Sequence, residues 1–150
     1  MLEERCNIWD KHAAHHPICI TTNGAVNHSG ACVMGRGVAS QAKQRFPKLP
    51  YDIGARIKDK KYSEYGLQCL WLPEYNLFSF PVKYHWSDPA DLELIAKSAR
   101  GLMFFLNNRH YPTLPVYLPR PGCGNGHRAW EEVGPVISTI LDNRVVVVTI

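Results

Sequence analysis

The stretch ICITTNGAVNHSGACVMGRG, residues 18–37, runs from a β-branched segment through a turn into a glycine-rich segment. Its first part, residues 18–22, is typical of a buried strand, and Asn23-Gly24 is a turn signal. Apolar side chains then recur every four residues, which predicts a helix that ends at Pro47. The apolar residues of this stripe are Met34, Val38, Ala42 and Phe46. A strand, a glycine-rich loop and a helix in this order are typical of an α/β sheet.

Strand and helix patterns continue to alternate along the rest of the chain. A charged, more exposed helix is predicted within residues 51–65, and later helices within residues 89–106 and 130–141. For the helix over 89–106, Asp88 is the expected N-cap and Pro89 the first helical residue. Further strands are predicted at 67–72, 77–82, 115–118 and 145–150, and the first two of these form a hairpin. This order predicts a three-layer α/β/α sandwich with a mixed central sheet.

Size and composition limit the class of protein. The chain has 150 residues, of which 45% are hydrophobic and 20% charged, so we expect one globular domain over residues 1–150. The longest apolar run, 145–150, is too short for a membrane span, and residues 1–12 lack the apolar core of a signal peptide. We therefore expect a cytoplasmic protein, monomeric and without membrane contact.

The cysteines and histidines do not predict a metal site. The five cysteines include no C-x-x-C pair, which argues against a disulfide framework or a four-thiolate zinc site. His12, His15 and His16 lie near Cys19, but no second ligand cluster completes a tetrahedron. We interpret them as a polar loop before a strand, and we expect neither a metal nor a cofactor.

Positive charge is concentrated in residues 36–61, where eight basic residues stand against two acidic ones, although the whole chain carries only +4. Such a basic segment could contact a nucleic-acid backbone. Solvated faces of two helices are the alternative interpretation.

Two glycine-rich segments, 30–37 and 122–126, each follow a predicted strand and precede a predicted helix. Backbone N–H groups in such loops can converge on an anion at the carboxyl ends of strands, so the pair indicates a clamp for a diphosphate. Tight turns alone are the alternative. Arg36 and Gly37 replace the lysine and hydroxyl of a P-loop, and Ser40 replaces the last glycine of a dinucleotide-binding fingerprint. The segment from Cys123 to Arg128 is one residue too short for a thiolate-phosphatase loop.

Four motifs, in order, resemble the macrodomain family. They are TNGAVN at 22–27, VMGRGVA at 33–39, FPVKYHW at 80–86, and LPRPGCGNG at 118–126 followed by Trp130. The resemblance is narrower to the branch that contains the terminal ADP-ribose protein glycohydrolase and the antitoxin macrodomains that remove ADP-ribose from DNA bases. It implies that ADP-ribose lies across the carboxyl edge of the sheet.

The same resemblance implies a set of ligand-binding residues. Asn7-Ile8 stands where the family has an Asp-Ile pair that reads the adenine, and Asn27 would face the distal ribose. Backbone groups of the two glycine loops would hold the diphosphate. The full expected set is Asn7, Ile8, Asn23, Asn27, Cys32, Val33, Met34, Gly35, Gly37, Val38, Pro121, Gly122, Cys123, Gly124, Asn125 and Gly126.

For catalysis, Lys83 matches the essential lysine of this branch, and a half-buried lysine could attack or stabilise charge at the anomeric carbon. The acids of related enzymes correspond to Gly126 and Ala129 here, and the neighbouring His127 is the candidate general acid or base. We expect hydrolysis of an ADP-ribosyl bond, with ADP-ribosylated nucleic acid as the preferred substrate. A non-catalytic ADP-ribose reader and a phosphatase acting on ADP-ribose 1″-phosphate are the alternatives.

Overall fold

The computed structural model describes residues 1–59, 66–109 and 113–149. Its strands are β1 (Leu2–Arg5), β2 (Ile18–Asn23), β3 (Leu70–Leu72), β4 (Leu77–Lys83), β5 (Val116–Pro119) and β6 (Val145–Thr149). Its helices are α1 (Ile8–Ala13), α2 (Gly37–Arg45), α3 (Leu49–Lys58), α5 (Leu92–Asn108) and α6 (Trp130–Ser138), with a 3₁₀ turn, η1 (Pro73–Tyr75). The strands form one sheet in the order β1-β6-β5-β2-β4-β3, in which only β3 pairs antiparallel.

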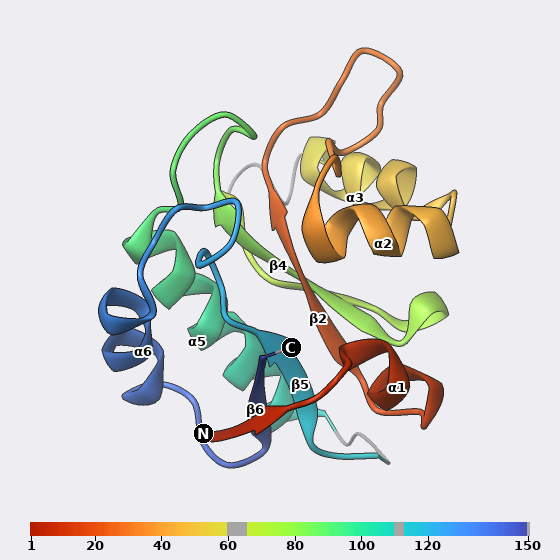
Figure 1. The fold of residues 1–150 in the computed structure, drawn as a ribbon. Coiled ribbons are helices and arrows are strands. Elements are labelled where there is room, and N and C mark those ends of the chain that lie inside the picture. The colour runs from red at the N-terminus through yellow and green to blue at the C-terminus, as the bar shows by residue number, and fades with distance from the viewer. Residues whose placement is uncertain (60–65, 110–112, 150) are drawn as a thin grey trace.

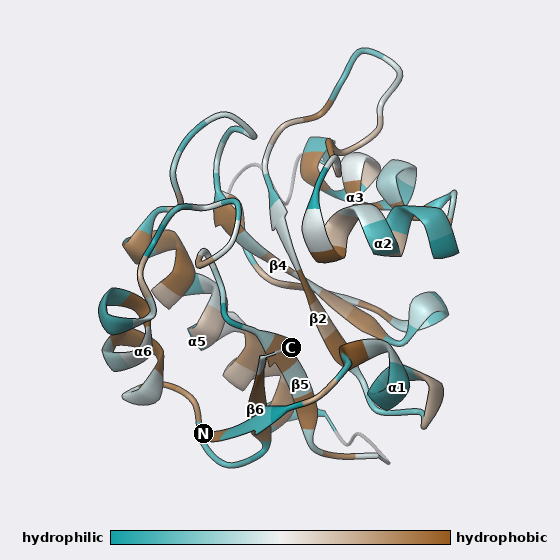
Figure 2. Cartoon of the chain, in the orientation of Figure 1, coloured by the Kyte–Doolittle hydropathy of each residue, from teal (hydrophilic) through white to brown (hydrophobic). Residues whose placement is uncertain are grey.

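Helices cover both faces of this sheet, with α1, α2 and α3 on one side and α5 and α6 on the other (Figure 1). Successive side chains of a strand point to opposite faces, and the central strands are apolar on both. In β2, Ile18 and Ile20 pack toward α1–α3, whereas Cys19 packs toward α5 and α6. Figure 2 shows the resulting hydrophobic strands between more hydrophilic outer surfaces. The predicted three-layer sandwich with a mixed sheet is confirmed.

The predicted start of the long helix is wrong by three residues. Asp91, not Asp88, is the N-cap: its carboxylate accepts a hydrogen bond from the Leu94 N–H at 3.0 Å, and α5 begins at Leu92. The preceding backbone bonds to other segments instead of starting a helical turn. The Ala90 N–H donates to the Gly126 carbonyl and the Asp91 N–H to the Val82 carbonyl.

The sequence patterns missed the first strand and helix. β1 is a strand whose four residues are all exposed, so it has no apolar face that a pattern could reveal. The six-residue α1 is capped by Asn7, whose side chain accepts from the Trp9 N–H at 2.9 Å. The helix predicted within 51–65 is α3, which begins earlier, at Leu49, and ends at Lys58. Residues 60–65 of that prediction, with Lys60 and Lys61, lie outside the described residues, as does residue 150 of the last strand.

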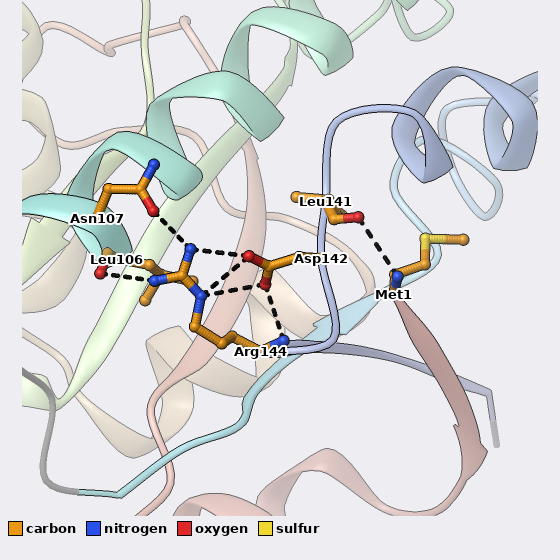
Figure 3. Close-up of polar contacts among 6 residues, drawn as sticks. All are labelled: Met1, Leu106, Asn107, Leu141, Asp142 and Arg144. Carbon is orange, nitrogen blue, oxygen red and sulfur yellow. Dashed lines mark hydrogen bonds and ion pairs between the residues drawn. The ribbon is translucent and has the colours of Figure 1, made fainter.

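A polar cluster ties the last strand to the long helix (Figure 3). The Arg144 guanidinium donates to the Leu106 carbonyl at 2.9 Å, to Asn107 Oδ1 at 2.6 Å, and to the Asp142 carboxylate. Three partners on two segments fix the turn into β6 against the end of α5. No helix built from the described residues has the length and apolarity needed to cross a bilayer.

Candidate functional site

Three loops meet at one edge of the sheet: residues 24–36 after β2, 84–91 after β4 and 120–129 after β5 (Figure 1). They meet because β2, β4 and β5 run parallel, so that their carboxyl ends share this edge. The Gly24 N–H lies 3.1 Å from both the Lys83 and the Tyr84 carbonyls, which joins the first loop to the second. The Ala90 N–H donates to the Gly126 carbonyl at 2.9 Å, which joins the second loop to the third.

Two asparagines shape the first loop. The buried Asn23 accepts from the Ala25 N–H at 2.9 Å and donates to the Val33 carbonyl at 3.0 Å. The exposed Asn27 accepts from the Ser29 and Ala31 N–H groups at 3.1 and 3.0 Å. Both side chains therefore hold the loop in shape through its own backbone, a role that spacing alone did not reveal.

The second glycine loop packs tightly against Ala90. A Cβ at Gly122, where φ is +77°, would lie 2.8 Å from the Ala90 Cβ, and a Cβ at Gly126 would lie 2.6 Å from the Gly122 carbonyl oxygen. Arg128 holds this arrangement, because its N–H donates to the Gly122 carbonyl at 2.9 Å and its Nε to the Ala90 carbonyl at 2.7 Å. With this backbone, position 126 has no room for a side chain.

Lys83 contacts the second glycine loop at Asn125, and Asn125 in turn lies beside the first. Its Nζ donates to the Asn125 carbonyl at 3.2 Å and to the Trp86 carbonyl at 2.9 Å. The Asn125 side chain reaches the first loop, since a Cβ on Gly37 would lie 3.2 Å from Asn125 Nδ2. Two predicted binding residues and the predicted catalytic lysine thus come together, although they are far apart in sequence.

Charges near Lys83 act on its pKa in opposite directions. Burial lowers the pKa of the Lys83 ammonium below its usual value, the positive charge of Arg36 lowers it further, and Asp88 acts against both. Sequence reasoning assigned Arg36 to a basic stretch and Asp88 to a helix cap, and missed both as neighbours of Lys83. Asp88 and Asp91 are both residue types that cap helices. Choosing Asp91 as the N-cap would have placed Asp88 in the loop that follows Lys83.

The other predicted residues differ in position and burial. His127 is exposed on the second glycine loop with φ +58°, and its N–H donates to the Gly124 carbonyl at 3.1 Å. Asn7 follows β1, which three strands separate from β4, so it does not join Lys83. Among the remaining predicted ligand residues, Ile8, Cys32, Met34 and Pro121 are buried, Val33, Val38 and Cys123 are partly buried, and Gly35 and Gly124 are exposed.

A cavity of about 330 Å³ opens beside the first glycine loop. Its lining includes Asn27 and residues 31–35 of this loop, together with Lys43, Pro47 and Tyr51 from farther along the chain. Five residues of the expected ligand set therefore face this hollow: Asn27, Cys32, Val33, Met34 and Gly35.

Two of the three histidines near Cys19 lie within hydrogen-bond distance of backbone carbonyls. His12 Nε2 lies 2.8 Å from the Tyr75 carbonyl oxygen, and His16 Nδ1 lies 3.0 Å from that of Pro115. Within residues 1–59, 66–109 and 113–149, no group of three His, Cys, Asp or Glu side chains could hold a metal ion.

Relatives can be identified by sequence, although no family model matches the chain. A DNA ADP-ribosyl glycohydrolase of Thermus aquaticus is 29% identical over 116 residues, which cover 73% of this chain and 31% of that protein. A DNA ADP-ribosyl transferase–DNA ADP-ribosyl glycohydrolase fusion protein of Thermosipho africanus is 28% identical over 141 residues, or 81% of this chain and 35% of that protein. The chain thus spans about a third of the length of these curated relatives.

Solved structures share the fold. The macrodomain of Thermus aquaticus DarG has a TM-score of 0.72 at 26% identity, over 100% of this chain and 98% of that one. The macrodomain of Mycobacterium tuberculosis DarG has a TM-score of 0.67 at 23% identity, over 90% and 89%. Thermosipho africanus DarTG, solved in complex with ADP-ribose, has a TM-score of 0.61 at 22% identity, over 89% of this chain and 37% of that one. Together with the three converging loops, these likenesses show that the chain has a macrodomain fold and is similar to the macrodomains of the DarG proteins.

Proposed function

We propose that this macrodomain binds ADP-ribose and hydrolyses the bond that links it to nucleic acid. The observation that carries the proposal is Lys83, which stands at the end of β4 with its Nζ bonded to the second glycine loop. The names of two relatives, both DNA ADP-ribosyl glycohydrolases in whole or in part, support the reaction. The ADP-ribose complex of the Thermosipho africanus neighbour supports the ligand.

In the proposed complex the diphosphate lies between the two glycine loops, where backbone N–H groups offer donors without side chains in the way. Gly35 and Gly124 suit this role, since a Cβ at either position meets nothing within 4 Å. Asn7 would bind the adenine through its carbonyl oxygen or amide group, and Asn27 would lie near the distal ribose.

The reaction adds water across the C1″–base bond. In the covalent route, neutral Lys83 Nζ forms a bond to C1″ while the C1″–base bond breaks, and its electron pair leaves with the base, which takes up a proton. Water then attacks C1″ and releases the amine, so that ribose gains the hydroxyl. In the alternative route, water attacks directly and the Lys83 ammonium stabilises negative charge on the leaving group. Both routes leave Lys83 unchanged.

The proton transfers need a second group, and we assign Asp88 as the first candidate. Its charge acts directly on Lys83, and it lies on the same loop as Trp86, whose carbonyl accepts from Nζ. His127 is the second candidate. Asp88→Asn should lower kcat by about 10²–10⁴-fold if Asp88 is the general acid or base. Glu131→Gln, on the first turn of α6, is the matched control and should keep full activity.

We propose that the nucleic acid lies along the basic segment of residues 36–58. The six described basic side chains of this segment are all exposed: Arg36, Lys43, Arg45, Lys48, Arg56 and Lys58. Lys43 also lines the cavity beside the first glycine loop. Charge reversal at Lys43 or Lys48 should weaken binding of an ADP-ribosylated oligonucleotide. The slope of log K against log salt concentration should become shallower by about 0.7 for each phosphate contact that is lost. Arg100→Glu on α5, in the opposite helical layer, is the control.

The deciding experiment is release of ADP-ribose from an ADP-ribosylated single-stranded DNA oligonucleotide by wild type and Lys83→Ala. Release by wild type alone supports the enzyme. Failure of wild type to release, with calorimetric binding of ADP-ribose intact, supports a reader instead. The crowding at Gly126 favours that second candidate, because it leaves the second glycine loop without the acid of the glycohydrolase. Light scattering would test the predicted monomer.

A further inference from the structure

Trp86 is the one tryptophan whose ring lacks a packing partner among the described residues. The chain has four tryptophans. Arg45 lies 4.3 Å from the Trp9 ring, Phe78 packs on Trp71 with ring centroids 4.6 Å apart, and Arg120 lies 4.6 Å from the Trp130 ring. Within the part of the chain that the structure describes, no such contact involves Trp86, which is 62% exposed, or Tyr84, which is 49% exposed.

The residues that carry these exposed rings follow the proposed catalytic lysine in the chain. Both follow Lys83 on the loop after β4, and the carbonyl of Trp86 accepts a hydrogen bond from Lys83 Nζ at 2.9 Å. The backbone of Trp86 is therefore hydrogen-bonded to the amine that we propose acts on C1″.

The backbone that carries the two rings is held at both ends. The Tyr84 carbonyl lies 3.1 Å from the Gly24 N–H, and the Asp91 N–H donates to the Val82 carbonyl at 2.8 Å. Inside the loop, the Asp88 N–H donates to the His85 carbonyl at 3.2 Å. Rings on an anchored loop lose little conformational freedom when a flat partner stacks on them.

We infer that Tyr84 and Trp86 form a stacking surface for the nucleobase that carries the ADP-ribose, and for its neighbour in a single strand. Proteins that bind single strands combine aromatic side chains with a positively charged path for the phosphates. Here Lys83, whose Nζ donates to the Trp86 carbonyl, and Arg36, whose charge acts on Lys83, supply positive charge next to this loop, and Asp88 is the acidic group on it. Extended bases in a single strand offer the flat faces that a duplex hides. This inference rests on the proposed function, because it assumes that nucleic acid carries the ADP-ribose.

The test compares Trp86→Ala and Tyr84→Ala with two controls. Trp86→Phe keeps an aromatic face, and Phe104→Ala removes a ring that is 65% exposed but lies 12 residues into α5, about 18 Å along the helix. For each variant, kcat/KM is measured on an ADP-ribosylated single-stranded oligonucleotide, and Kd is measured for free ADP-ribose. Trp86→Ala should lose about 5- to 150-fold in kcat/KM. Trp86→Phe should retain most of the activity, Phe104→Ala should match wild type, and Kd for ADP-ribose should stay within about twofold throughout.

A second arm measures binding without turnover. In a Lys83→Ala background, the affinity for the ADP-ribosylated oligonucleotide is divided by the affinity for free ADP-ribose, and Trp86→Ala should reduce this ratio. If wild type releases no ADP-ribose, the proposed hydrolysis fails, and this ratio alone still decides the inference. The inference is overturned if Trp86→Ala and Phe104→Ala give the same kcat/KM and the same affinity ratio. It is also overturned if Trp86→Ala weakens binding of free ADP-ribose, or of an ADP-ribosylated peptide, as much as it weakens binding of the ADP-ribosylated oligonucleotide.

Discussion

Replacing Gly126 by alanine adds one methyl group at the tightest point of the second glycine loop. The new Cβ would lie 2.6 Å from the Gly122 carbonyl oxygen and 2.8 Å from both Gly122 Cα and Ala90 Cβ. These separations are 0.6–0.8 Å shorter than the 3.4 Å at which ordinary contact begins, and two of the three atoms belong to backbone. The loop must therefore shift as a unit.

The expected cost follows from the contacts that this shift disturbs. Overpacking by one methyl costs about 1–3 kcal/mol. The Ala90 N–H to Gly126 carbonyl bond and the Arg128 N–H to Gly122 carbonyl bond, both 2.9 Å, would lengthen, and each is worth about 1 kcal/mol. If lengthening removes about half of each bond's contribution, the total is about 2–4 kcal/mol, which corresponds to a fall in Tm of roughly 4–16 °C for a domain of this size.

Thermal unfolding followed by circular dichroism measures this difference. Gly124→Ala is the matched control, because a Cβ there meets nothing within 4 Å, and its Tm should stay within about 2 °C of wild type. Gly126→Asp should be at least as unstable as Gly126→Ala and should not gain activity. If the Tm of Gly126→Ala equals that of Gly124→Ala, the predicted crowding at Gly126 is refuted.

Three further predictions concern other parts of the molecule. Hydrogen bonds from Arg144 lower the pKa of the Asp142 carboxyl, so its stabilising effect is present above its usual pKa of 3.8 and lost as pH falls through the lowered pKa. The Tm gap between wild type and Asp142→Asn should therefore close in acid, and a gap that persists unchanged would contradict the ion pair. Native thiol labelling followed by mass spectrometry should modify only Cys6 and Cys123 of the five cysteines, because the others are buried; a third label would count against that burial. Arg128→Ala should cost about 1–3 kcal/mol in urea unfolding and weaken ADP-ribose binding, and unchanged values would refute its role in the loop.

The central strands could be predicted from sequence because burial on both faces leaves a clear apolar signal. Residues 18–22 and 145–149 both showed it, and both are strands of the sheet interior. β1 could not be found this way, since its position at the edge of the sheet leaves every side chain exposed. The start of α5 could not be predicted because it depends on a tertiary contact. The Ala90 N–H donates to the Gly126 carbonyl, far along the chain, and the helix begins only after Asp91, its N-cap.

For the candidate site, the sequence could predict the motifs but not which residues of each motif pack against a neighbouring loop and which stay open. Glycine spacing suggested two phosphate loops, yet Gly126 packs against Ala90 while Gly124 stays open, a distinction that only the neighbouring loop decides. Likewise, the motif that contains Lys83 did not reveal that Asn125 accepts its hydrogen bond. Contacts between segments 40 residues apart leave no local pattern.

The exposed first strand has a consequence for how the protein behaves at high concentration. An unpaired sheet edge is a template on which another chain can add a strand, and such pairing starts aggregation. On β1 this edge carries Glu3, Glu4 and Arg5, charges that must be desolvated before a further strand can join. The opposite edge, β3, offers only three residues. Neutralising Glu3 and Glu4 would thus remove a barrier to self-assembly that contributes little to the folded monomer itself.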